Sequence, residues 1–116
     1  MGVEVYLIKM IAGVYFETWL DWKGRLSTID PKFNVVYLAF ADPRATPTGN
    51  NWQGTGLGFT ASREQVKTDI AKLQSLGVCV MLSVGGATYP FPVPFDARHM
   101  FQLAMDLGCN GIDIDW

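Results

Sequence analysis

Apolar residues along this chain fall into short continuous runs, and a loop or an amphipathic segment separates each run from the next. Three runs, at 10–16, 34–41 and 78–84, have the length and composition of strands that are buried on both faces. A fourth strand is expected at 111–116, where two acids stand on an apolar, β-branched segment. Residues 3–8 either extend the first strand or pack elsewhere as a leader. The pattern therefore predicts about four strands.

Two segments between these runs place apolar residues at helical spacing. In the first, Ser62 and Gln65 stand at the two ends of a capping box, and Gly77 stands where a C-terminal glycine belongs. Its apolar positions are Val66, Ile70, Leu73 and Leu76. The second helix is predicted to begin near Asp96 and to end at Gly108. Its expected buried residues are Met100, Phe101, Ala104 and Leu107.

Continuous apolar strands that alternate with helices indicate an α/β fold of parallel (β/α) units with right-handed crossovers. Both an open doubly wound sheet and part of a (β/α)₈ barrel satisfy the pattern. No phosphate-binding glycine fingerprint follows the first strand, and the long Gly- and Pro-rich loop at 43–61 is typical of the active face of a barrel. A complete barrel takes about 250 residues. We therefore expect residues 1–116 to form one partial domain, the N-terminal half of a TIM barrel.

Composition and charge exclude several classes of function. The net charge is −2 and the nine basic residues are scattered, so we expect no nucleic-acid partner. No run is long enough to span a membrane, and nothing has metal-ligand or cofactor-binding spacing. Cys79 and Cys109 are isolated in or beside apolar segments, which favours buried thiols over a disulfide. Glu4 and Lys9 interrupt a short apolar stretch, so we expect no signal peptide within these residues.

The chain closes on two acids that share one face of the last strand. Asp113 and Asp115 are two residues apart, and a strand points such side chains in the same direction. A further acid at position 117, beyond this sequence, would complete a row of three. Carboxyl groups in a row suit glycoside hydrolysis, in which one protonates the leaving oxygen and others organise charge around the sugar.

Four motifs in collinear order resemble those of family 18 glycoside hydrolases, the chitinase family. Residues 83–86 (SVGG) are similar to the S-x-G-G motif, and residues 110–116 (NGIDIDW) resemble the D-G-x-D-x-D-x-E signature without its glutamate. Residues 15–19 (YFETW) and 37–40 (YLAF) are similar to the motifs of the first two strands. The resemblance extends over residues 10–116.

The resemblance implies retaining, substrate-assisted hydrolysis of β-1,4-linked N-acetylglucosamine polymers such as chitin, without a cofactor. It implies that Asp115 orients the acetamido group, that Asp113 shares a proton or charge with it, and that Ser83 and Tyr15 hydrogen-bond Asp113. Carboxyls this close should raise the pKa of at least one of them. The expected substrate-binding residues are Tyr15, Phe40, Ser83, Gly85, Gly86 and Trp116. The resemblance is also compatible with secretion.

Two departures from the signature bear on activity. Asn110 stands where aspartate is usual; it accepts hydrogen bonds but carries no charge. Without the glutamate, the 116-residue chain is expected to be close to inactive, because general acid catalysis contributes about 10²–10⁴-fold. The alternatives are a chitinase-like lectin that binds without cleaving and a half-barrel module that self-assembles. An endo-β-N-acetylglucosaminidase also stays open, although Trp116 favours the chitinase version of the motif.

Aromatic residues outside the motifs divide into two groups. Core packing is favoured over sugar stacking for Trp19 and Trp22, whereas both interpretations stay open for Trp52 and Tyr89 in the candidate active-face loops. A half-barrel also leaves its first and fourth strands as open edges with apolar faces on both sides. Such edges invite pairing with another chain, so we expect self-association.

Overall fold

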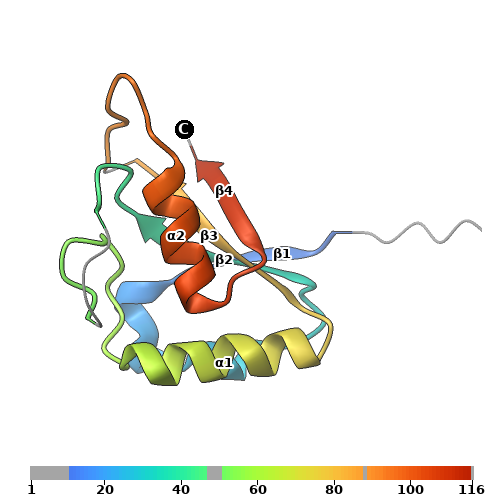
Figure 1. Cartoon of the computed structure of the whole chain (residues 1–116). Coiled ribbons are helices and arrows are strands. Elements are labelled where there is room, and N and C mark those ends of the chain that lie inside the picture. Colours follow the sequence, from blue (N-terminus) through green and yellow to red (C-terminus); the bar gives the residue numbers. More distant parts are fainter. Residues whose placement is uncertain (1–10, 47–50, 88, 116) are drawn as a thin grey trace, which may run out of the picture.

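The computed structural model of the chain describes residues 11–46, 51–87 and 89–115. One parallel sheet has the order β1-β2-β3-β4 (Figure 1), formed by β1 (Gly13–Glu17), β2 (Val35–Ala41), β3 (Cys79–Gly85) and β4 (Gly111–Asp115). The helices α1 (Arg63–Ser75) and α2 (Arg98–Leu107) connect β2 to β3 and β3 to β4. Two short 3₁₀ helices, η1 (Thr18–Lys23) and η2 (Leu26–Thr28), connect β1 to β2. The predicted α/β fold is confirmed, and four sequential parallel strands are consistent with half of a barrel.

The ends of α1 and α2 follow the local signals in the sequence. The Ser62 hydroxyl accepts a hydrogen bond from the Gln65 backbone N–H at 3.2 Å, which caps α1. The Gln65 side chain donates to Asp69 Oδ1 at 3.0 Å, a partner that the capping-box pattern does not indicate. Gly77 and Gly108 follow the two helices with φ of +83° and +81°, so both occupy the left-handed position that glycine favours.

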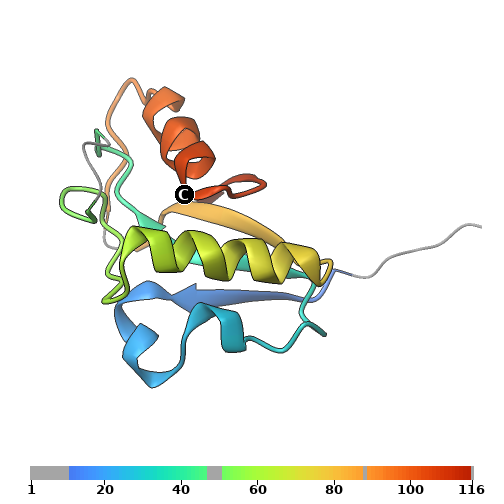
Figure 2. The same ribbon diagram turned by 60° about the horizontal axis from the view of Figure 1, so that its bottom comes forward.

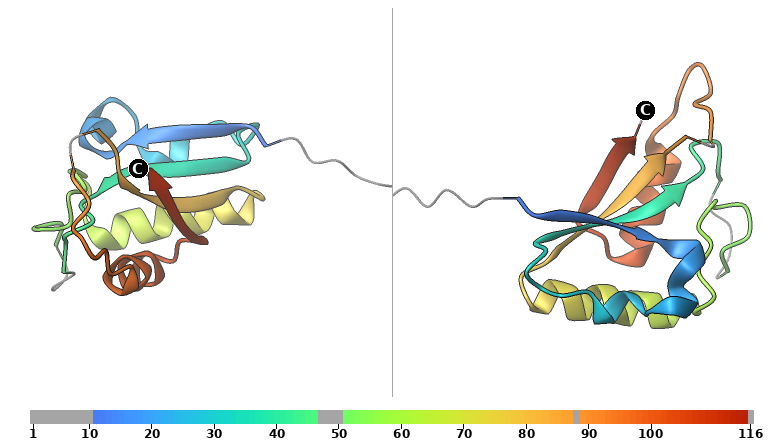
Figure 3. Two further views of the ribbon diagram at one scale, coloured as in Figure 1. Left: turned by 90° about the horizontal axis from the view of Figure 1, so that it is seen from above. Right: turned by 180° about the vertical axis from the view of Figure 1, so that it is seen from behind.

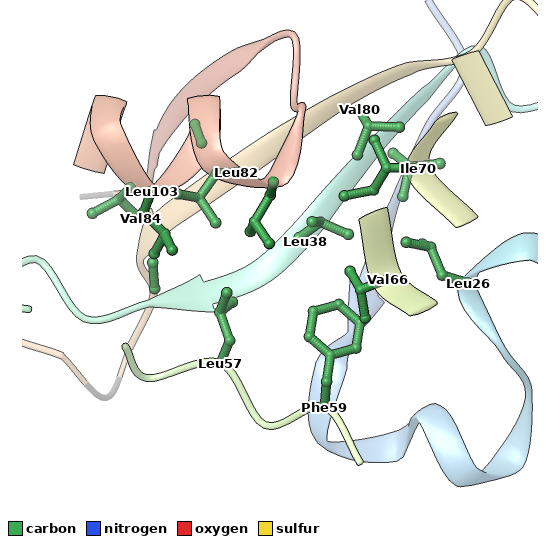
Figure 4. Packing of buried hydrophobic residues seen from close by; sticks show 14 of the residues in the cluster. Leu26, Leu38, Leu57, Phe59, Val66, Ile70, Val80, Leu82, Val84 and Leu103 are labelled. Carbon is green, nitrogen blue, oxygen red and sulfur yellow. The ribbon is translucent and has the colours of Figure 1, made fainter. Parts of the chain in front are cut away.

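One face of the sheet is covered by both helices and forms the core. Figure 2 shows α1 lying in front of the strands, and Figure 3 (left) shows α1 and α2 on the same side of the curved sheet. Leu38 of β2 and Val80 and Leu82 of β3 are completely buried here, and they pack with α1 residues such as Ile70 (Figure 4). Burial of each such side chain contributes about 1.5–3 kcal/mol. This face is what holds the strands in register.

Several residues that were predicted to be buried are exposed. Phe101 is 50% exposed, and Leu103 takes its place because Leu103 lies three residues after Met100 and four before Leu107. Leu76 is 53% exposed because it is the C-cap residue, where the chain leaves the helix. The prediction that Trp19 and Trp22 pack in the core is also wrong, because both tryptophans lie in η1 and are exposed.

The opposite face of the sheet is partly open to solvent and is not uniformly apolar. Tyr15, Tyr37 and Met81 stand side by side across β1, β2 and β3 because their backbones are paired in register. Asp113 continues this face on β4. In a complete barrel this face would line the interior. The sequence-based expectation of apolar residues on both faces is therefore wrong for this one.

The strands being parallel, their C-terminal ends meet at one edge of the sheet, where the loops after β2 and β3 gather (Figure 3, right). Residues 3–8 and the first residue of the predicted strand at 10–16 lie outside the described residues. Neither α1 nor α2, the α-helices of the described part, is long and apolar enough to cross a membrane.

Candidate active site

The two acids of β4 lie beside the motif that ends β3. Ser83 pairs in register with Asp113, and Gly85 pairs with Asp115. The Ser83 side chain is completely buried, and its hydroxyl donates to Asp113 Oδ2 at 2.9 Å. Asp113 and Asp115 are both half-buried, whereas Ile114 between them points to the other face. The serine therefore fixes the orientation of the inner carboxylate.

Tyr15 of β1 faces the same side of the sheet. Its ring stacks on Tyr37 with centroids 4.9 Å apart and lies 5.8 Å from the ring of Phe40. The pKa of Tyr15 is raised above its usual value, first by partial burial and then by the negative charges of Asp113 and Asp115. Tyr15 therefore keeps its proton at neutral pH, and its hydroxyl stays a hydrogen-bond donor in the field of both carboxylates.

Gly85 and Gly86 are required by both conformation and space. Their φ angles are +108° and +78°, which L side chains rarely adopt. A Cβ on Gly85 would collide with the Asp115 carbonyl oxygen, and one on Gly86 would lie 2.9 Å from the Phe40 ring. The Gly86 N–H donates to the Asp115 carbonyl at 2.9 Å. The two glycines thus let the chain turn tightly against the end of β4.

An aromatic cavity opens at the C-terminal ends of the strands. Its volume is about 350 Å³, and its walls are Trp19, Phe40, Gly56, Ala87 and Tyr89. The Phe40 ring lies 6.4 Å from that of Trp19, and the Tyr89 hydroxyl donates to the Gly56 carbonyl at 3.0 Å. These walls do not include the two acids of β4. Phe40 connects the cavity to them, because the same ring also neighbours Tyr15.

The tryptophans differ in their surroundings. Trp52 packs on Phe59 with centroids 4.9 Å apart and donates its indole N–H to the Ala61 carbonyl at 2.8 Å, so it belongs to the core. Trp19 is 46% exposed and forms a cavity wall, which the sequence interpretation missed. Its position just after β1, at the active edge of a barrel, was the signal that could have found it. Trp116 lies outside the described residues.

Asn110 connects the start of β4 to β3 and to α1 by hydrogen bonds. Its side-chain oxygen accepts from the Val80 N–H at 2.8 Å and from the Gln74 amide nitrogen at 3.1 Å. Its own N–H donates to the Val80 carbonyl at 2.7 Å. The Asn110 side chain acts here only through its oxygen, as a hydrogen-bond acceptor. Asparagine can therefore replace aspartate without loss of these bonds. Among the described residues, no cluster of three or more His, Cys, Asp or Glu side chains could hold a metal ion.

Parallel (β/α) units with paired carboxylates, a buried serine and aromatic rings at the C-terminal ends of the strands define a barrel segment whose candidate site lies at the edge where barrel enzymes carry theirs. No family model matches the chain. Two solved structures share the fold. A chitinase A from Streptomyces coelicolor has a TM-score of 0.66 and 26% identity over 88% of this chain and 38% of its own. A family GH18 chitinase from Chromobacterium violaceum has a TM-score of 0.67 and 27% identity over 90% of this chain and 30% of its own.

Curated sequences agree with the structures. Chitinase Chi52 of Paenibacillus xylanexedens is 35% identical and chitinase D of Niallia circulans is 32% identical, each over 101 residues. Both matches cover 78% of this chain but only 18% of the relative, so the chain spans about a fifth of the length of these two proteins. The chain is therefore similar to family 18 chitinases over most of its length.

Proposed function

We propose that this segment carries part of the sugar-binding and catalytic site of a chitinase-type glycoside hydrolase. The parent enzyme hydrolyses β-1,4 linkages between N-acetylglucosamine units with retention, and the substrate's own acetamido oxygen attacks the anomeric carbon. The observation that supports this most directly is the 2.9 Å hydrogen bond from buried Ser83 to Asp113, with Asp115 one pleat further on the same face. Chitinase matches over most of the chain support the same class of substrate.

Each residue of the site has a role in this proposal. Asp115 accepts a hydrogen bond from the acetamido N–H, turns the acetamido oxygen toward the anomeric carbon, and stabilises the positive oxazolinium intermediate. Asp113 shares a proton or charge with Asp115 as that intermediate forms. Ser83 holds Asp113 in place. Tyr15 stays neutral on the same face, and its proposed role is to offer its hydroxyl to Asp113 or the bound sugar. Phe40, Gly85, Gly86 and Trp116 are the remaining proposed substrate-binding residues.

The general acid of the family signature falls at position 117, beyond this sequence. We propose that the 116-residue polypeptide by itself binds N-acetylglucosamine oligosaccharides but does not hydrolyse chitopentaose, in which the leaving group is a sugar. The reason is that protonation of a sugar leaving group contributes about 10²–10⁴-fold to the rate. Hydrolysis by the purified polypeptide that Asp115→Ala abolishes would overturn this part of the proposal.

Binding is the decisive experiment, measured by titration calorimetry with chitopentaose and with cellopentaose, which lacks the acetamido groups. We expect chitopentaose to bind and cellopentaose to bind at least tenfold more weakly. Asp115→Asn should weaken chitopentaose binding, whereas the matched control Asp106→Asn, on the exposed side of α2, should not. Equal affinity for the two sugars, or equal affinity of the two variants, would contradict the proposal.

A chitin-binding lectin is the second candidate, and the aromatic cavity favours it because stacking on rings needs no acid. The two candidates differ in what they require of Asp115. A lectin whose affinity comes from Trp19 and Phe40 would bind chitopentaose equally well after Asp115→Asn. The residue at position 117 of the parent gene separates them further, since glutamate there means an enzyme.

We also propose that the isolated chain self-associates. Within the described sheet, β1 and β4 each have one neighbour only, so each leaves a row of backbone N–H and C=O groups without a strand partner. Pairing of these edges between copies would satisfy those groups. Size-exclusion chromatography with light scattering is expected to give a mass above 12.9 kDa, and a compact species at that mass would refute the proposal.

A further inference from the structure

The described part of the chain contains one threonine that joins three segments through a single hydroxyl. Thr18 is completely buried at the start of η1, directly after β1. Its Oγ1 donates to the Ala39 carbonyl at 2.7 Å and accepts from the Gly58 N–H at 2.9 Å. The partners are 21 and 40 residues away in the sequence. The hydroxyl thus connects the end of β1, the end of β2 and the loop that follows β2.

Each of these bonds is made next to a wall of the aromatic cavity. Trp19 follows Thr18, and Phe40 follows Ala39, so the bond to Ala39 ties the two backbones together next to both rings. The third partner, Gly58, lies against Trp19 so closely that an added Cβ would be 2.8 Å from the Trp19 Cβ. The Thr18 hydroxyl thus links the two backbones that carry the Trp19 and Phe40 rings, which lie 6.4 Å apart, just beyond the last β1–β2 pair, Glu17 and Ala39.

A second buried group holds the same loop at a different point. The Asp21 carboxylate accepts from the Thr60 N–H and hydroxyl at 2.9 and 2.7 Å and from the Ala61 N–H at 3.1 Å. These bonds anchor the loop to η1 but do not reach β2. Loss of the Thr18 hydroxyl would leave the loop attached to η1 through Asp21, and to the end of β2 through the Asp42 N–H bond to the Thr55 carbonyl at 2.8 Å. It would remove only the side-chain link beside Trp19 and Phe40.

We propose that Thr18 is a positioning residue for the sugar-binding cavity: its buried hydroxyl fixes the Trp19 and Phe40 rings at the spacing that grips an N-acetylglucosaminyl ring. The inference rests on the proposed function for the identity of the ligand. The positioning itself rests on the hydrogen bonds and ring contacts alone. Thr18 acts through the rings of Trp19 and Phe40 and does not need to touch the sugar.

The test compares Thr18→Val, which keeps the shape and loses the hydroxyl, with Thr18→Ser, which keeps the hydroxyl. The matched control is Thr68→Val, because the Thr68 hydroxyl bonds a helix carbonyl, that of Glu64, far from the cavity. A second route to the same effect is Gly58→Ala, which pushes directly on Trp19 without removing a hydrogen bond. The readouts are chitotriose affinity by calorimetry and the nuclear Overhauser contacts between the Trp19 and Phe40 rings.

We expect Thr18→Val and Gly58→Ala to lose the ring-to-ring contacts and to bind chitotriose at least tenfold more weakly, while Thr18→Ser and Thr68→Val stay within threefold of the parent chain. Unchanged contacts in both Thr18→Val and Gly58→Ala overturn the inference. If Thr18→Val does not fold, Gly58→Ala and Thr18→Ser decide it by the same criteria. A parent chain that shows the contacts but binds no chitotriose refutes the proposed function and leaves the positioning to be judged by the contacts.

Discussion

Replacement of Gly85 by alanine tests whether the end of β3 is shaped by contact with β4. The backbone at Gly85 has a φ of +108°, and an alanine Cβ would collide with the Asp115 carbonyl oxygen and lie 2.6 Å from the Phe91 ring. A positive φ costs an L residue about 1–2 kcal/mol. Overpacking of a filled site adds about 1–3 kcal/mol. Together the change is expected to cost about 2–5 kcal/mol out of the 5–15 kcal/mol (roughly) that keep a domain folded.

The matched control is Gly77→Ala, since Gly77 has a φ of +83° but nothing within 4 Å of the added Cβ. Gly77→Ala should show only the conformational part, about 1–2 kcal/mol. Urea unfolding, with a slope of about 1–3 kcal/mol per molar, resolves the difference as a shift in midpoint. Gly85→Ala should shift it about twice as far. Equal shifts for the two variants would mean that the Asp115 contact contributes nothing, and the explanation of the S-x-G-G motif given above would be wrong.

Three further predictions concern buried or shielded polar groups. Asp21→Asn should lower the free energy of unfolding by about 1.5–3 kcal/mol, measured in urea, because a buried carboxylate that binds Thr60 is replaced by an amide that cannot accept at both oxygens. The raised pKa of Tyr15 means that the unfolded chain ionises first, so stability should fall as pH rises above about 10. Asp113→Asn should lower that pKa in an absorbance titration; an unchanged value would contradict the assigned electrostatic cause. Burial raises the pKa of the Cys109 thiol to about 12, so iodoacetamide at pH 8 should label Cys109 far more slowly than a model thiol by mass spectrometry.

The strands and helices were predictable because their signals are local. Runs such as 34–41 and 78–84 are apolar except for Asn34 and Ser83, and the residues of β2 and β3 that face the helices are completely buried. Ser62 and Gly77 mark the ends of α1 by side-chain and backbone preferences that act within a few residues. The helix α2 begins at Arg98, two residues after the predicted start near Asp96, and its N-cap residue Ala97 makes no side-chain cap.

The surroundings of the aromatic residues were not predictable in the same way. Trp19 and Trp52 are chemically identical, yet one forms a cavity wall and the other packs on Phe59. Trp19 follows Thr18, whose bonds reach residues 21 and 40 positions away, whereas Trp52 contacts Phe59 and Ala61 of its own loop. Neither set of contacts produces a periodic sequence pattern. The positions of Ser83 and Asp113 could be predicted, because the regular pairing of adjacent strands determines which residues face each other. Ser83 and Asp113 are 30 residues apart, but the parallel register of adjacent strands brings them opposite one another.

The two faces of the sheet meet opposite physical demands, and this contrast argues for a site on the open face. On the helix-covered face, Leu38 and Val80 are completely buried, as stability requires. On the open face, carboxylates at Asp113 and Asp115 add nothing to hydrophobic burial, and half-buried charge costs free energy unless it is hydrogen-bonded. The hydroxyl of the fully buried Ser83 offsets this cost for Asp113 by donating a hydrogen bond to its carboxylate. Stability alone does not call for a buried serine that orients one of two neighbouring carboxylates on a partly open face, so the arrangement supports the proposed site.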